Sequence, residues 1–175
     1  MRRLRHLFPL FVLLLSGVSA ASAASPFAGR WRLDRSRSSA LDGWSAWDLV
    51  ISVEGTRVNL RHDMQWNATR FSATNVVDTA HPVMLPHFFR VEQRHMALYP
   101  AKGESTPVTA AWIDGGRTLR MEAEEPVEIS QGHATLRIYS EYRLLDGDRE
   151  LLLIELHSSR PRPLVYRFIR VDGKD

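Results

Sequence analysis

The sequence predicts an all-β protein, an antiparallel up-and-down β-barrel of about nine or ten strands. Apolar residues recur at every second position through most of residues 27–171, which is the pattern of strands with one buried face. Turn signals such as Asp114-Gly115-Gly116 separate these runs, and no long segment shows helical periodicity. Closure into a barrel removes exposed strand edges, which favours it over the alternative, a two-sheet sandwich.

Four runs of alternation in the first half predict four strands. Their apolar faces are, in chain order, Phe27, Gly29, Trp31 and Leu33; Trp47, Leu49, Ile51 and Val53; Val58, Leu60, His62 and Met64; and, more weakly, Phe71, Ala73 and Val77. A short helical turn is expected near residues 36–41. Residues 80–89 contain Pro82 and Pro86, which indicates an irregular loop or an edge.

The second half shows clearer alternation. The apolar sets are Val108, Ala110 and Trp112; Leu119, Met121 and Ala123; Ala134, Leu136, Ile138, Tyr142 and Leu144; Leu152, Ile154 and Leu156; and Val165, Ile169 and Val171. An acidic cluster, Glu122, Glu124, Glu125 and Glu128, accompanies the second of these sets. Because Glu122 and Glu124 alternate with apolar residues, a solvated strand face is favoured over a pair of catalytic carboxylates.

Residues 1–23 have the layout of a cleaved secretory signal peptide, ahead of a single domain in residues 24–175. Arg2, Arg3 and Arg5 precede a mostly apolar run over residues 7–18, and Ala21-Ser22-Ala23 forms a cleavage motif. The apolar run is too short for a spanning helix, and we expect no membrane span in the mature chain. The protein is therefore expected to be periplasmic or secreted.

The charge balance changes when this segment is removed. The full chain has 23 Lys and Arg against 20 Asp and Glu. Three of the arginines lie in residues 1–23, so the mature chain has 20 of each sign and is formally neutral. A neutral chain lacks the field that attracts phosphate backbones, which disfavours nucleic acid as a partner. The absence of cysteine excludes disulfides and thiolate metal sites.

The first predicted strand contains a glycine-x-tryptophan motif, Gly29-Arg30-Trp31, followed by Asp34 and Ser38. This motif is similar to the first strand of lipocalin-type (calycin) barrels. The chain resembles exported bacterial lipocalin-like proteins of unassigned function over most of residues 27–171.

This resemblance implies that Trp31 closes one end of the barrel and that an arginine of the last strand packs across it. Arg167 and Arg170 are the two candidates in residues 164–171. A guanidinium over an indole face stabilises by about 0.5–2 kcal/mol.

Among the six histidines of the mature chain, His62 is expected to face the barrel interior. There it is a candidate for orienting a small ligand, with Met64, Trp112, Met121 and Tyr142 as walls. The alternatives are a core histidine hydrogen-bonded to its neighbours and a histidine at the barrel rim. The histidine spacings do not define a metal site, and no motif indicates a cofactor.

The leading functional hypothesis is non-covalent binding of a small apolar molecule inside the barrel, without catalysis. One alternative is a cell-envelope interaction protein with a filled barrel, which would act through loops such as residues 80–90 or 100–107. A less favoured alternative is a barrel enzyme that uses an inward histidine as a base. No motif identifies a protein partner.

Overall fold

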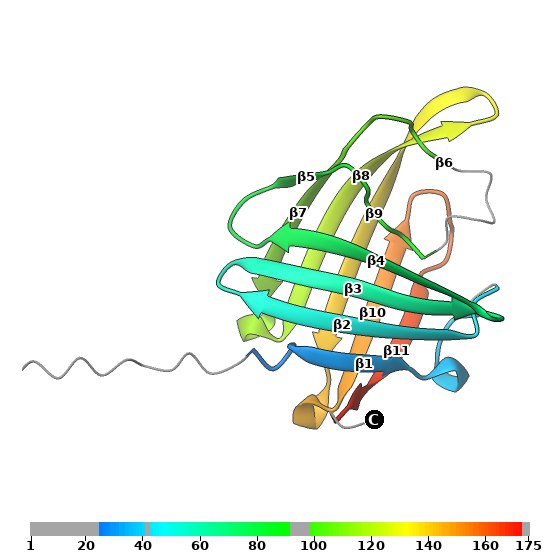
Figure 1. The fold of residues 1–175 in the computed structure, drawn as a ribbon. Helices are drawn as coiled ribbons and strands as arrows, with labels where there is room; N and C mark the ends of the chain where they lie inside the picture. Colours follow the sequence, from blue (N-terminus) through cyan, green and yellow to red (C-terminus); the bar gives the residue numbers. More distant parts are fainter. Residues whose placement is uncertain (1–24, 41–42, 92–98, 173–175) are drawn as a thin grey trace, which may run out of the picture.

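Eleven antiparallel strands form the computed structural model, which describes residues 25–40, 43–91 and 99–172 (Figure 1). In chain order they are β1 (Gly29–Leu33), β2 (Ala46–Glu54), β3 (Arg57–Trp66), β4 (Thr69–Asp78), β5 (Val83–Leu85), β6 (Tyr99–Pro100), β7 (Thr106–Ile113), β8 (Thr118–Ile129), β9 (Gly132–Leu144), β10 (Glu150–His157) and β11 (Leu164–Val171). The predicted all-β barrel is confirmed. Two of the strands, β5 and β6, are very short, which accounts for the smaller number expected.

Three single turns of 3-10 helix connect strands: η1 (Arg35–Arg37), η2 (Asp114–Gly116) and η3 (Asp146–Asp148). The last two occupy the predicted Asp-Gly turns, where Gly115 and Gly147 have φ of 63° and 72°, values that favour glycine. No helix among the described residues is long and apolar enough to cross a membrane. The predicted signal peptide lies outside the described residues.

The strands pair in the order β4-β3-β2-β1-β11-β10-β9-β8-β7-β5. The barrel is therefore nearly closed, with β4 at one edge of the sheet and β5 and β7 at the other (Figure 1). The short strand β6 lies outside this order and pairs with β8. The gap between the two edges is the place where an irregular segment can enter the barrel.

Aromatic side chains fill the interior around Trp47. The Trp47 ring lies 4.8 Å from that of Phe168 and 5.0 Å from that of Tyr166, both edge-on. All three side chains are fully buried, as is Trp31. Large aromatic groups in such contact stabilise a core beyond the area that they bury, so this region is packed core rather than an open cavity.

The expected inward faces of the last two long strands are wrong by one residue. In β10 the buried residues are Leu151, Leu153, Glu155 and His157, and in β11 they are Leu164, Tyr166 and Phe168. The expected sets, Leu152, Ile154 and Leu156 with Val165, Ile169 and Val171, lie on the outer face and are half-buried or exposed. Both faces of β10 carry leucine or isoleucine, so alternation cannot choose between them. The register with β9, which pairs Leu151 with Leu144, sets the choice.

Arg170 of β11 packs across the buried Trp31 ring of β1. The Arg170 guanidinium carbon lies 4.1 Å from the centre of the Trp31 ring, and Trp31 Nε1 donates to the Phe27 carbonyl at 2.9 Å. A Cβ added to Gly29 would lie 2.8 Å from Arg170 Nη1, and Gly29 has a φ of 139°. Arg167 instead pairs with Glu150 at 2.9 Å.

Candidate functional site

Residues 88–91 enter the gap between the barrel edges, and all four are buried. Asn75 of β4 holds this segment with two hydrogen bonds to Phe89. Its Nδ2 donates to the Phe89 carbonyl at 2.8 Å, and the Phe89 amide donates to its Oδ1 at 2.9 Å. The side chain therefore replaces a neighbouring strand and satisfies backbone groups that would otherwise be buried without partners.

Arg90 fixes the same segment to the other side of the barrel. Its Nε lies 2.6 Å from Glu125 Oε2 on β8, and the two side chains are 2% and 1% exposed. Burial raises the pKa of Glu125, and the Arg90 guanidinium opposes this shift. Glu125 Oε1 accepts no hydrogen bond from any described residue.

The expected solvent exposure of the acidic cluster is wrong for Glu125. Glu122, Glu124 and Glu128 are exposed, but Glu125 is buried between Ala123 and Val127. The alternation of β8 contains this signal, because Leu119, Met121 and Ala123 share their face with position 125.

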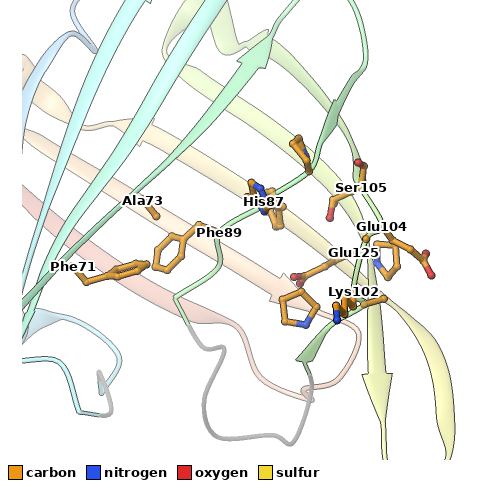
Figure 2. A pocket seen from close by; sticks show the side chains of 15 residues that line it. Phe71, Ala73, His87, Phe89, Lys102, Glu104, Ser105 and Glu125 are labelled. Atoms are coloured by element: carbon orange, nitrogen blue, oxygen red, sulfur yellow. The ribbon is translucent and has the colours of Figure 1, made fainter.

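A pocket of about 620 Å³ lies beside this ion pair, between β4, the 86–89 segment and the loop before β7. Its walls are mostly apolar: Phe71, Ala73, Pro86, Phe88, Phe89, Pro100, Ala101 and Pro126. Figure 2 shows the Phe71 and Phe89 rings on one side and the Glu125 carboxylate pointing into the pocket from β8. Lys102 and Glu104 belong to the loop that forms the opposite wall (Figure 2).

His62 of β3 lies beside the pocket wall without being part of it. Its ring stacks on Trp47 at 5.5 Å and contacts Phe89 at 5.0 Å, and it is paired across strands with Ala73. Neither ring nitrogen has a hydrogen-bond partner among the described residues. Burial lowers the pKa of His62 to about 3, so the imidazole is neutral at physiological pH.

The other expected wall residues lie elsewhere in the barrel. Met64, Met121 and Tyr142 are buried, and burial raises the pKa of Tyr142 well above its usual value. Trp112 is half-buried, 4.8 Å from the Phe27 ring. None of these four, nor His62, belongs to the pocket walls. Tyr142 and Met121 lie on neighbouring inner faces of β9 and β8.

Two further ionisable residues, Glu155 and His157, lie on the inner face of β10, which is not the face expected from the sequence. His157 Nε2 lies 3.5 Å from Glu155 Oε2, and both side chains are almost fully buried. Among the described residues, no group of three His, Asp or Glu side chains could hold a metal ion. His95 and Gln93 lie outside the described residues.

Comparison with known proteins identifies solved structures with a similar fold. No protein-family model matches the chain, and a search of curated proteins finds no match. A structure described as a REP1-NXSQ fatty acid transporter is 12% identical, with a TM-score of 0.53 over 86% of this chain and 100% of that chain. A fatty acid-binding protein from brain tissue of Drosophila melanogaster is 10% identical, with a TM-score of 0.51 over 82% and 98% of the two chains. The chain therefore has a lipocalin-like (calycin) β-barrel fold.

Because His62 is buried, we expect the free energy of unfolding to fall in mild acid. The unfolded chain binds a proton near pH 6.5, whereas the folded pKa is about 3. The contribution of neutral His62 to the free energy of unfolding is therefore fully present above pH 6.5, and it is lost as the pH falls toward 3. Between pH 7 and pH 5 we expect the free energy of unfolding to fall by about 2 kcal/mol. Urea denaturation at the two pH values measures this difference.

The matched variants for this test are His62→Phe and His133→Phe. His133 is exposed, so its replacement should leave the loss in acid unchanged, whereas His62→Phe should remove most of it. An equal loss in the wild type and in the His62 variant would contradict the prediction.

Proposed function

We propose that the protein binds a small, mainly apolar molecule without catalysis, in the pocket between β4 and the 100–106 loop. The observation that carries the proposal is the pocket itself, which combines apolar walls with a single buried carboxylate, Glu125. A cavity of this size with few polar groups is typical of small-molecule sites. The pocket lies at the barrel gap, beside the packed aromatic core rather than within it.

The two structures named above support this proposal. Their names describe a fatty acid transporter and a fatty acid-binding protein, and their barrels are similar to this one. Because fold alone does not fix function, the pocket contributes the independent argument. Native mass spectrometry after mild purification tests for a retained molecule directly.

Filling the pocket should abolish binding. Ala73 is half-buried in the pocket wall, so the ring of an Ala73→Trp variant is expected to occupy the space of a ligand. We expect its affinity for the neutral dye Nile red to fall at least about tenfold, with little change in thermal stability. Fluorescence titration measures the affinity.

The matched control is Thr74→Trp, the next residue of β4, which is exposed on the outer face. This variant should bind the dye as the wild type does. Unchanged dye binding by Ala73→Trp would place the ligand elsewhere or overturn the proposal.

A second candidate is a cell-envelope interaction protein with a filled barrel. The observation that favours it is the aromatic packing of Trp47, Tyr166 and Phe168, which occupies the interior beside the pocket. Under this hypothesis, the purified protein carries no molecule and does not bind Nile red, while loops such as residues 80–90 or 100–107 bind a protein.

We also propose that residues 1–23 direct export and are removed, so that the mature protein is periplasmic or secreted. The basic start, the apolar run and the Ala21-Ser22-Ala23 motif support this proposal. The intact mass of the protein from a bacterial periplasmic fraction tests it. A full-length mass confined to the cytoplasm would contradict it.

A further inference from the structure

We infer that the pocket selects ligands whose polar end donates a hydrogen bond, a hydroxyl or an amine, and disfavours carboxylates. This inference rests on the proposed function and specifies the ligand class for the same pocket. It is carried by the orientation of the Arg90–Glu125 pair relative to the pocket wall.

The ligand would meet the acid of this pair rather than the base. Glu125 is part of the pocket wall and points into it (Figure 2), whereas Arg90 does not belong to the wall. The Arg90 Nε lies against Oε2, at 2.6 Å. Oε1 accepts no hydrogen bond from the described residues, although Glu125 is only 1% exposed.

A buried carboxylate oxygen without a donor costs free energy that a ligand can recover. A hydroxyl or ammonium group supplies a donor, and hydrogen bonds to charged acceptors are stronger than neutral ones. A ligand carboxylate is ionised at neutral pH, has no donor, and would approach a second carboxylate in a site of low dielectric constant. The Glu125 environment therefore discriminates against fatty acids that enter with the carboxylate first.

The rim of the pocket does not reverse this preference. Lys102 is the only Lys or Arg side chain among the described residues that line the pocket, and Glu104 lines it too. Both are exposed, and an ion pair between an exposed lysine and a ligand carboxylate contributes little in water. Glu125 is the charged wall residue that is shielded from solvent.

Three probes of equal chain length test the inference: dodecanol, dodecylamine and dodecanoate. Each displaces Nile red from the purified protein at neutral pH, below its micelle concentration. We expect dodecylamine and dodecanol to bind at least about tenfold more tightly than dodecanoate.

The variant that isolates the effect is the double replacement Arg90→Met with Glu125→Leu. It removes both charges together, because Glu125→Gln alone takes the carboxylate charge away from a buried guanidinium and can unfold the protein. The double variant should bind all three probes with affinities within about threefold of one another. The control Glu124→Gln, whose side chain is exposed on the outer face of β8, should keep the wild-type preference.

The outcomes separate the inference from the proposed function. Tighter binding of dodecanoate, or equal binding of all three probes by the wild type, would overturn the inference and leave the proposed function standing. A dodecanoate preference that disappears in Lys102→Met would also overturn it and place the end-group contact at the rim. Failure of Nile red and all three probes to bind would overturn the proposed function itself, and the inference with it.

Discussion

Replacing Glu125 with leucine alone is expected to lower the free energy of unfolding by about 3–5 kcal/mol. The reason is the Arg90 guanidinium, which is 2% exposed and would keep its charge after losing the carboxylate 2.6 Å away. The double variant Arg90→Met with Glu125→Leu replaces the pair by apolar groups, and it should recover most of this loss. Urea denaturation followed by tryptophan fluorescence measures all three free energies.

The control is Glu124→Leu, which changes an exposed side chain of the same strand. Its effect should stay within about 0.5 kcal/mol. A loss below about 1 kcal/mol for Glu125→Leu would show that Arg90 reaches water or another partner when the acid is removed. In that case the 86–91 segment would not depend on this ion pair for its place in the barrel.

The barrel could be predicted because alternation recurs in most of its long strands. Period-two alternation identified β8 and β9 with the correct inner faces, including Met121, Ile138 and Tyr142. The same rule failed in β10, where Leu151-Leu152-Leu153-Ile154 offers two apolar faces. There the inner face follows from pairing with β9, a property of the assembled sheet and not of the strand alone.

The pocket could be predicted only in part. Glu125 continues the alternation of Leu119, Met121 and Ala123, so its inward position was present in the sequence. Arg90 lies in a segment without periodicity, and its position depends on the Asn75–Phe89 hydrogen bonds. Contacts between an irregular segment and a distant strand produce no local sequence pattern. The sequence therefore does not predict the Arg90–Glu125 pair.

The packed interior of the barrel and the gap between its sheet edges therefore differ in what fills them. Aromatic packing around Trp47 and the Trp31–Arg170 contact use the interior for stability. The barrel gap, where β4 and β5 are not hydrogen-bonded to each other, leaves room for the 86–91 segment and the pocket beside it. A ligand site at the gap can vary in shape and polarity while the aromatic core stays intact.

The second large effect is expected at Trp31. Its ring is fully buried, its Nε1 donates to the Phe27 carbonyl, and the Arg170 guanidinium covers one face. Replacement by alanine opens a cavity and removes these contacts, which should cost about 3–5 kcal/mol. Thermal and urea denaturation measure the loss, and Trp66→Ala, at a position that is 42% exposed, should cost much less.

Replacing Arg170 is also expected to destabilise the protein, because its side chain makes several contacts of its own. Besides covering Trp31, it donates to the carbonyls of Ala28 and Asp148, each at 2.9 Å, and to that of Pro26. Arg170→Met should therefore destabilise by more than Arg167→Met, since the Arg167 side chain pairs with Glu150 on the outer surface. A double-mutant cycle of Trp31→Leu with Arg170→Met isolates the contact between the two side chains. Equal costs for the two arginine variants would show that packing around Trp31 does not depend on Arg170.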